Sequence, residues 1–169
     1  MEKEANLKIL IKPSDMHHYL VQQTYRSFSG WFGVLLSIAA LVALVTGYQT
    51  NEAYKNVILL IIGALFLVVQ PLQLKMQSIQ KVRSIPMFQE PLEYKINHEG
   101  IKVSQKDEEM AVEWNSIRKV IETGKSILVF TSPVSAFIFP KEQYADQVDI
   151  VREIIKENVK EEQCKWRKN

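Results

Sequence analysis

Two nearly pure apolar runs dominate the hydropathy pattern of the chain. They cover residues 31–48 and 57–74, each 18 residues long and without a charge, and a polar loop over residues 49–56 separates them. A helix rises roughly 1.5 Å per residue, so runs of this length nearly match a hydrocarbon core about 30 Å thick. The pattern therefore predicts a transmembrane helical hairpin over residues 31–74.

Two other interpretations of the apolar runs fit less well. A signal peptide would start near the N-terminus and end at a small-residue cleavage site, whereas the first run follows a polar segment of 30 residues that contains acidic residues. Two core helices of a soluble protein would need a large protein around them, because helices that are apolar on every side must be enclosed. The remaining 125 residues are too few for that.

Basic residues beside the hairpin predict its orientation. Lys12 and Arg26 precede it, and Lys75, Lys81 and Arg83 follow it, whereas the only basic residue of the connecting loop is Lys55, three residues after Glu52. Cytoplasmic flanks of membrane spans carry an excess of lysine and arginine. We therefore expect a multi-pass membrane protein, with both termini in the cytoplasm and the loop outside.

The flanks of the hairpin are expected to continue its helices. In the N-terminal segment, residues 1–30, a short strand over Asn6–Ile11 precedes a helix that starts after Ser14 and runs without a break into the first span. After the second span, which Pro71 is expected to kink, residues 75–87 extend the helix into the cytoplasm until Pro86 ends it.

Small residues in the spans predict close helix packing, because they allow two backbones to approach. The second span is the favoured partner of the first, and a homo-oligomer contact through the spans is the alternative. The residues concerned are Gly33, Ser37, Ala39, Ala43 and Gly47 in the first span and Gly63 in the second.

Residues 88–160 change to short alternating runs separated by turn residues, which predicts an antiparallel meander. Six strands are expected, and the strand Asn6–Ile11 is a candidate seventh. A helix capped by Asp146 follows, and residues 161–169 form a charged, frayed tail. The fold class is therefore membrane α+β, a transmembrane hairpin with a cytoplasmic β-sheet or barrel and a C-terminal helix, as in pleckstrin-homology domains. The expected strands are Leu92–Asn97, Ile101–Gln105, Met110–Trp114, Ser116–Thr123, Ser126–Thr131 and Val134–Phe139.

Composition narrows the function classes. The net charge is +2, which gives no bulk attraction for nucleic acid, and the single cysteine, Cys164, excludes an internal disulfide. Adjacent His17 and His18 point to different helix faces and make a poor metal pair. With no glycine-rich phosphate loop and no charge inside the spans, we expect no catalytic residues, no cofactor and no metal site.

Three polar or aromatic positions in the β region invite a functional interpretation. Trp114 is expected to fill the core, and Glu122, at a strand end before a hairpin, to be solvated. Lys141 could contact an anionic lipid headgroup together with Lys75, Lys81 and Arg83, although a place at the strand ends or in water is favoured.

A series of short motifs follows the two spans in a recognisable order. They are Tyr94, Glu99-Gly100-Ile101, Trp114-Asn115-Ser116-Ile117, Val120-Ile121-Glu122-Thr123 and Ile138-Phe139-Pro140-Lys141. In order and spacing the series resembles the YcxB-like family of bacterial membrane proteins, most closely over Leu92–Lys141. The resemblance implies two spans and a cytoplasmic domain similar to pleckstrin-homology domains, and it implies no established activity.

Three functions remain open from the sequence. The first is a membrane-anchored, non-catalytic interaction module that binds a protein or peptide partner at the cytoplasmic face. The second is recognition of anionic lipid by the β domain, which is weakened by a near-neutral balance of 13 basic and 14 acidic residues over positions 91–169. The third is immunity against a membrane-active toxin.

Overall fold

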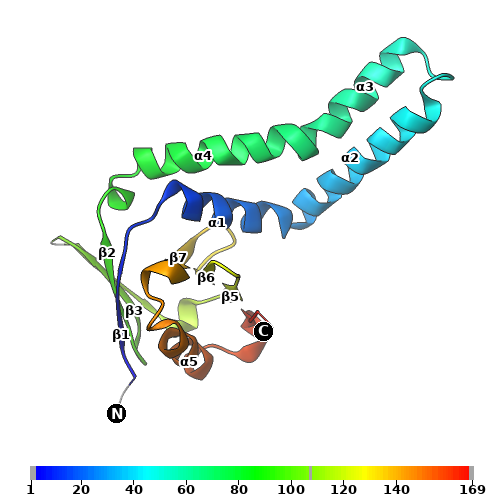
Figure 1. Cartoon of the computed structure of the whole chain (residues 1–169). Helices are drawn as coiled ribbons and strands as arrows, with labels where there is room; N and C mark the ends of the chain where they lie inside the picture. The colour runs from blue at the N-terminus through cyan, green and yellow to red at the C-terminus, as the bar shows by residue number, and fades with distance from the viewer. Residues whose placement is uncertain (1–2, 107, 168–169) are drawn as a thin grey trace. The chain divides into compact units, whose positions relative to one another are not determined.

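The computed structural model describes residues 3–106 and 108–167. They divide into two compact units (Figure 1). The helical unit is His17–Gln80, and the β unit contains the other described residues. Helices α1 and α4 cross the boundary between the two units.

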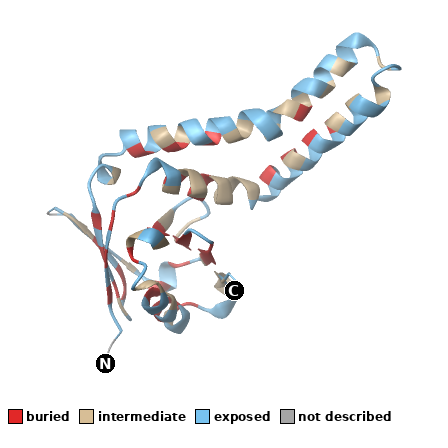
Figure 2. Ribbon diagram, viewed as in Figure 1, coloured by how far each residue is buried: buried red, intermediate tan, exposed pale blue. Residues whose placement is uncertain are grey.

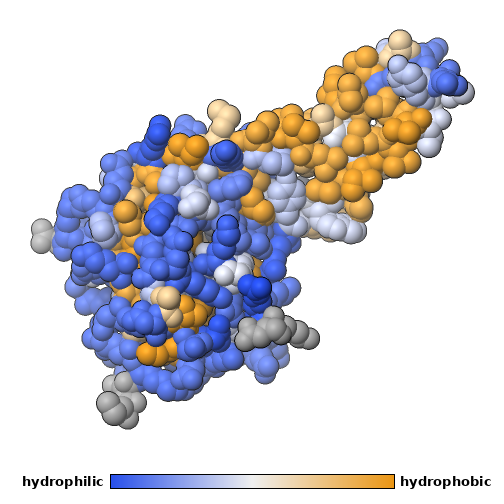
Figure 3. Space-filling model, in the orientation of Figure 1, coloured by the Kyte–Doolittle hydropathy of each residue, from blue (hydrophilic) through white to orange (hydrophobic). Residues whose placement is uncertain are grey.

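The helical unit contains two helices that are long and apolar enough to cross a membrane. One is α2, Phe28–Gly47, and the other is a continuous helix over Ala53–Ser84. Only 22% and 11% of the residues in their most apolar stretches are buried, so these helices lack the enclosure of core helices (Figure 2). Over Phe28–Gly47 and Ala53–Ala64 their surface is mostly apolar (Figure 3). The helices that lie wholly or partly in this unit are α1 (Pro13–Tyr25), α2, α3 (Ala53–Ala64), a π-helical turn (Leu65–Val69) and α4 (Gln70–Ser84).

The helix is interrupted between α1 and α2, where the sequence predicts an unbroken helix. Ser27 is extended, with φ −77° and ψ 150°, and its hydroxyl accepts a hydrogen bond from the Gly30 N–H at 3.1 Å. The same hydroxyl donates to the Thr24 carbonyl at 2.6 Å. Serine is a preferred N-cap because its oxygen replaces a missing helical acceptor. The prediction was therefore wrong, because a new helix starts at Ser27.

The irregularity expected at Pro71 takes the form of a π-helical turn directly before it. The Gln70 N–H bonds to the Leu65 carbonyl five residues earlier, and Pro71 has no N–H. The Phe66 carbonyl therefore loses both helical donors that could reach it. The Tyr25 hydroxyl donates to it at 3.4 Å instead.

The β unit contains two open four-stranded sheets, and the described residues do not close into a barrel. Sheet 1 is fully antiparallel in the order β1-β2-β3-β4, and sheet 2 has the order β7-β6-β5-β8, with β8 parallel to β5. The expected seventh strand thus joins sheet 1 beside β2. The strands are β1 (Ala5–Ile9), β2 (Leu92–Ile96), β3 (Gly100–Gln105), β4 (Glu108–Glu113), β5 (Lys119–Glu122), β6 (Ser126–Phe130), β7 (Ala136–Pro140) and β8 (Cys164–Lys165).

A 3-10 turn at Trp114–Ser116 divides the expected single meander into two sheets. It replaces the start of the strand predicted from Ser116, and β5 begins only at Lys119. The Trp114 side chain is buried, and its indole N–H donates to the Asn97 carbonyl at 3.0 Å. This anchor turns the chain out of sheet 1 and confirms the expected core role of Trp114.

Helix α5, Val148–Asn158, packs an apolar stripe inward, as its pattern predicts. Val151, Ile154 and Ile155 are almost fully buried. Its N-cap is Gln147 rather than Asp146. The tail is not frayed as expected over its described part, because Cys164–Lys165 pairs with β5. The remaining short helices are the 3-10 turns Pro86–Phe88, Lys141–Gln143 and Glu161–Gln163.

The core of the β unit follows from strand alternation. In β1 and β2 every second residue is buried, and the two strands pair in register with Leu7 opposite Tyr94. The Tyr94 ring meets Phe139 of sheet 2 edge to face, with 5.1 Å between the ring centroids. Burial raises the pKa of the Tyr94 hydroxyl well above its ordinary value.

Candidate functional site

Three of the small residues predicted for helix packing hold the hairpin together. A Cβ on Gly33 would lie 2.2 Å from the Phe66 ring, and one on Gly63 would lie 2.5 Å from Leu41. The Ser37 hydroxyl donates to the Ile62 carbonyl at 2.9 Å. These contacts join the two apolar helices within one chain.

The other small residues of the first span lie outside this contact. Ala39 and Ala43 are exposed, and Gly47 is half-buried beside Asn51 in the connecting loop. The face that carries the two alanines therefore has no role in packing within the described chain. A homo-oligomer contact through this face stays a prediction.

The four basic residues considered for headgroup binding lie on two different elements of the chain. Lys75, Lys81 and Arg83 are exposed on α4, and Lys81 and Arg83 are two residues apart, which places them on different sides of the helix. Lys141 follows β7 at the start of a 3-10 turn, and its side chain is only 19% exposed.

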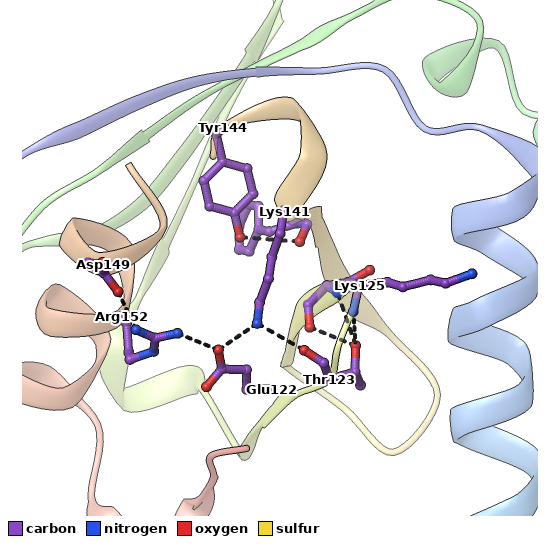
Figure 4. Close-up of polar contacts among 9 residues, drawn as sticks. Glu122, Thr123, Lys125, Lys141, Tyr144, Asp149 and Arg152 are labelled. Carbon is purple, nitrogen blue, oxygen red and sulfur yellow. Dashed lines mark hydrogen bonds and ion pairs between the residues drawn. The ribbon is translucent and has the colours of Figure 1, made fainter. Parts of the chain in front are cut away.

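Glu122, at the end of β5, accepts two cationic donors in a buried cluster (Figure 4). Its side chain is 3% exposed, and its Oε1 accepts from Lys141 Nζ at 2.6 Å and from Arg152 Nη2 at 2.7 Å. Lys141 Nζ also donates to the Thr123 carbonyl at 2.9 Å. Arg152 pairs in addition with Asp149. The expectation that Glu122 is solvated was wrong, because two chain segments distant in sequence cover it.

The cluster keeps the Glu122 carboxylate ionised. Burial alone raises the pKa of this carboxyl, but hydrogen bonds from Arg152 and Lys141 outweigh burial and lower it below its ordinary value. The cluster connects β5, the turn after β7 and α5, and it uses the Lys141 ammonium twice. We therefore interpret it as a structural junction, and the proposed headgroup role of Lys141 loses support.

No group of three or more histidine, cysteine, aspartate or glutamate side chains that could hold a metal occurs among the residues that the structure describes. Cys164 is half-buried in β8. Burial and the nearby Glu161 raise the pKa of its thiol, which makes the reactive thiolate scarcer.

Glutamine side chains cover the outer edge of β1 at two positions. The Gln147 amide accepts from the Asn6 N–H and donates to the Asn6 carbonyl, both at 3.2 Å. The Gln143 amide does the same at Leu10, at 2.9 and 3.0 Å. An amide that bonds both backbone groups of one residue replaces the neighbouring strand. In sheet 2, β8 covers the outer edge of β5 in a similar way.

The outer edge of β4 has no such cover. The Asn97 N–H donates to the Gly100 carbonyl at 3.1 Å, so the backbone groups of Gly100 face β2. Because successive residues of an antiparallel strand direct their N–H and C=O groups to opposite sides, this bond determines which residues of β3 face β2 and which face β4. With the β3–β4 register, it follows that Met110 and Val112 direct their backbone groups toward β3. The N–H and C=O groups of Glu109, Ala111 and Glu113 therefore point outward, and no other described strand pairs with them.

A groove of about 540 Å³ lies beside this open edge, between β4 and the β6–β7 hairpin. Met110 is 50% exposed in it, although its side chain lies on the core side of sheet 1. The lining residues are Met110, Ala111, Val112, Glu113, Ser116, Thr131, Ser135, Ala136 and Phe137. The sequence did not predict this site, because whether a strand edge is left without a neighbour depends on which strands pair in the folded sheet.

A larger hollow of about 790 Å³ lies over the β2–β3 turn. Lys95 and Lys102 line it, but both are already paired, Lys95 with Glu4 at 3.0 Å and Lys102 with Glu109 at 2.7 Å. Exposed pairs of this kind are common on solvated sheet faces. The groove beside β4 is therefore the better candidate for a binding site.

The family comparison concerns the β unit. Residues 96–155 match the family model of the YcxB-like protein. The resemblance read from the motifs is confirmed over this segment. No curated protein and no solved structure matches the chain significantly.

The YcxB-like segment contains the candidate site. It runs from the last residue of β2 into α5, and so includes both the open β4 edge and the Glu122 junction. Strand β1 and the helical unit lie outside the matched residues.

Proposed function

We propose that this protein is a membrane-anchored, non-catalytic interaction module whose β unit binds a protein or peptide partner. The open β4 edge beside the groove is the observation that carries the proposal. Unpaired strand edges are templates for another chain, and folded proteins normally block them. This chain covers Asn6 and Leu10 along the outer edge of β1, and the outer edge of β5, with its own residues, yet it leaves Glu109, Ala111 and Glu113 of β4 open.

The apolar helices support the membrane part of the proposal. Two helices of sufficient length and with little burial have a surface suited to lipid. The basic residues around them favour cytoplasmic termini. Confinement to a membrane raises the effective concentration of a partner in the same membrane, so weak contacts at one strand edge become sufficient.

The proposal extends to the fold class. Sheets β1–β4 and β5–β7 followed by a C-terminal helix have the element order of a pleckstrin-homology domain. Such a scaffold serves recognition rather than one chemistry, because function depends on the site that a fold carries.

Photo-crosslinking of the full chain in intact cells tests the interaction. A photoreactive side chain at Ser116, an exposed residue of the groove, is compared with one at Lys160, an exposed residue outside its lining. We expect a protein adduct at Ser116 that is absent at Lys160. Equal adducts at both positions, or none at Ser116, would contradict the proposal.

A second candidate function, recognition of anionic lipid, has one observation in its favour. Lys75, Lys81 and Arg83 are exposed on the helix that continues the second apolar segment. Each basic group near an anionic surface contributes on the order of 1 kcal/mol. Lipid adducts from a photoreactive group at Met76, and their loss when all three residues become glutamine, would support this function.

A further inference from the structure

We propose that the β4 edge binds an extended peptide segment whose side chains alternate between basic and apolar. The inference rests on the proposed interaction function and specifies the partner by its chemistry. The partner would add a fifth strand to sheet 1, next to β4.

The backbone of β4 sets the geometry of the added strand. Outward N–H and C=O groups occur at every second residue, Glu109, Ala111 and Glu113. An extended segment of five residues would match them with its first, third and fifth residues, whose own backbone groups face β4. The backbone contacts give affinity without selecting a sequence.

Side chains on the two faces of the added strand determine which peptide sequences bind. Residues one, three and five of the peptide would lie on the outer face of sheet 1, beside Glu109, Ala111 and Glu113. Residues two and four would point to the groove, where they would cover Met110 and Val112 and approach Phe137. The expected pattern is basic, apolar, any residue, apolar, basic.

The negative charge of β4 favours a partner segment with basic side chains. The strand carries Glu108, Glu109 and Glu113 and no basic residue. Glu109 is neutralised in part by Lys102, whereas Glu113 accepts only a neutral amide hydrogen bond from Asn115 among the described contacts. Lysine or arginine at the ends of the motif would complement both carboxylates.

The same charges disfavour a second copy of this chain as the occupant. In the antiparallel register that pairs the outward backbone groups of Glu109, Ala111 and Glu113 with those of a copy, Ala111 faces itself and Glu109 faces Glu113, twice. Like charges directly opposite in a sheet are destabilising. The β4 edge is therefore protected against self-association while it remains open to a basic strand.

The test uses the full chain in detergent micelles and the peptide acetyl-Ser-Lys-Val-Thr-Val-Lys-Ser-amide. Hydrogen exchange should slow at the amides of Glu109, Ala111 and Glu113 when the peptide is added. The amides of Met110 and Val112, already bonded to β3, serve as the internal reference. A peptide with both lysines replaced by glutamate should bind about tenfold more weakly or worse.

Two matched pairs isolate the backbone contact. Methylation of the threonine amide of the peptide removes an N–H that faces β4 and should abolish binding, whereas methylation of the second valine amide should not. In the protein, Ala111→Pro removes the outward N–H and should abolish binding, whereas Ala111→Val should retain it. Unchanged protection of Met110 and Val112 shows that Ala111→Pro still folds.

Each outcome is decisive. No slowed exchange in the wild-type protein, or equal binding by Ala111→Pro, or equal binding by the threonine-methylated peptide, would overturn the inference. If the cellular adduct at Ser116 persists in Ala111→Pro, the partner binds without β4 and only the inference fails. If that adduct is absent in the wild-type protein as well, the proposed function fails.

Discussion

The side-chain amide of Gln147 bonds both backbone groups of Asn6. Its Oε1 accepts from the Asn6 N–H and its Nε2 donates to the Asn6 carbonyl, each at 3.2 Å. This glutamine thereby satisfies, at one residue of β1, the backbone hydrogen bonds that a neighbouring strand would make. This relationship ties the N-terminal strand to the start of α5, 141 residues later in the chain.

Replacement of Gln147 by alanine tests this closure. We expect the free energy of unfolding to fall by about 1 kcal/mol, because two hydrogen bonds at a partly solvated edge are lost. Urea unfolding of the full chain, followed by tryptophan fluorescence, measures the change. Asp146→Ala is the matched control, since Gln147 and not Asp146 is the N-cap of α5, and it should leave stability unchanged.

The buried Glu122 carboxylate is expected to make the folded protein less stable in acid. Its folded-state pKa lies below its unfolded value, so its contribution is fully present above about pH 4.3. That contribution is lost as the pH falls through the lower, folded-state pKa. Glu122→Gln should cost about 3 kcal/mol at pH 7, because it leaves Lys141 and Arg152 without their shared anion.

The comparison of Glu122→Gln with Asp149→Asn isolates the effect of burial. Asp149 pairs with the same arginine but is 86% exposed, so its replacement should change stability little. Unfolding curves between pH 3 and 7 should converge for wild type and Glu122→Gln at the acidic end. Curves that keep a constant separation would show that the charge of Glu122 does not matter.

Gly33 is predicted to be a sensitive position at the contact between the two apolar helices. A methyl group there would overlap the Phe66 ring, so Gly33→Ala should force the two helices apart. We expect a lower thermal midpoint in detergent, by several degrees for a cost of about 1 kcal/mol. Ala43→Val adds volume on an exposed face and should have no effect on a single chain. A drop in Ala43→Val that depends on protein concentration would instead reveal a homo-oligomer.

Tyr25 and Pro71 are predicted to be energetically coupled through the Phe66 carbonyl. Tyr25→Phe removes the donor that this carbonyl uses, which should cost about 1 kcal/mol. Pro71→Ala restores an N–H within reach of that carbonyl and should reduce the cost of Tyr25→Phe. A double-mutant cycle on thermal unfolding measures the coupling. Additive effects would contradict this explanation of the π-helical turn.

Features that depend on local pattern were predictable from the sequence. The two apolar helices follow from uninterrupted hydrophobic runs, and they extend beyond the predicted spans because their flanks also favour helix. The hairpins at His98-Glu99 and Gly124-Lys125 follow from turn residues between alternating runs.

Features that depend on distant residues were not predictable. At the division into two sheets, the Trp114 indole donates a hydrogen bond to Asn97, 17 residues away. The burial of Glu122 depends on Lys141 and Arg152, 19 and 30 residues later. At Ser27 the sequence does contain a capping signal, but the long apolar run after it favoured a continuous helix.

Cysteine labelling tests the central claim, that the apolar hairpin crosses a membrane with the β unit on the inner side. Cys164 is first replaced by serine, because its raised thiol pKa would make weak labelling ambiguous. Single cysteines are then placed at Gln49, in the loop between the apolar helices, and at Glu99, in the β2–β3 turn. Both positions are exposed.

A membrane-impermeant maleimide is applied to intact cells and to cells that have been permeabilised. We predict that Gln49→Cys is labelled in intact cells and that Glu99→Cys is labelled only after permeabilisation. Labelling of Glu99→Cys in intact cells, or of neither site before permeabilisation, would contradict the account.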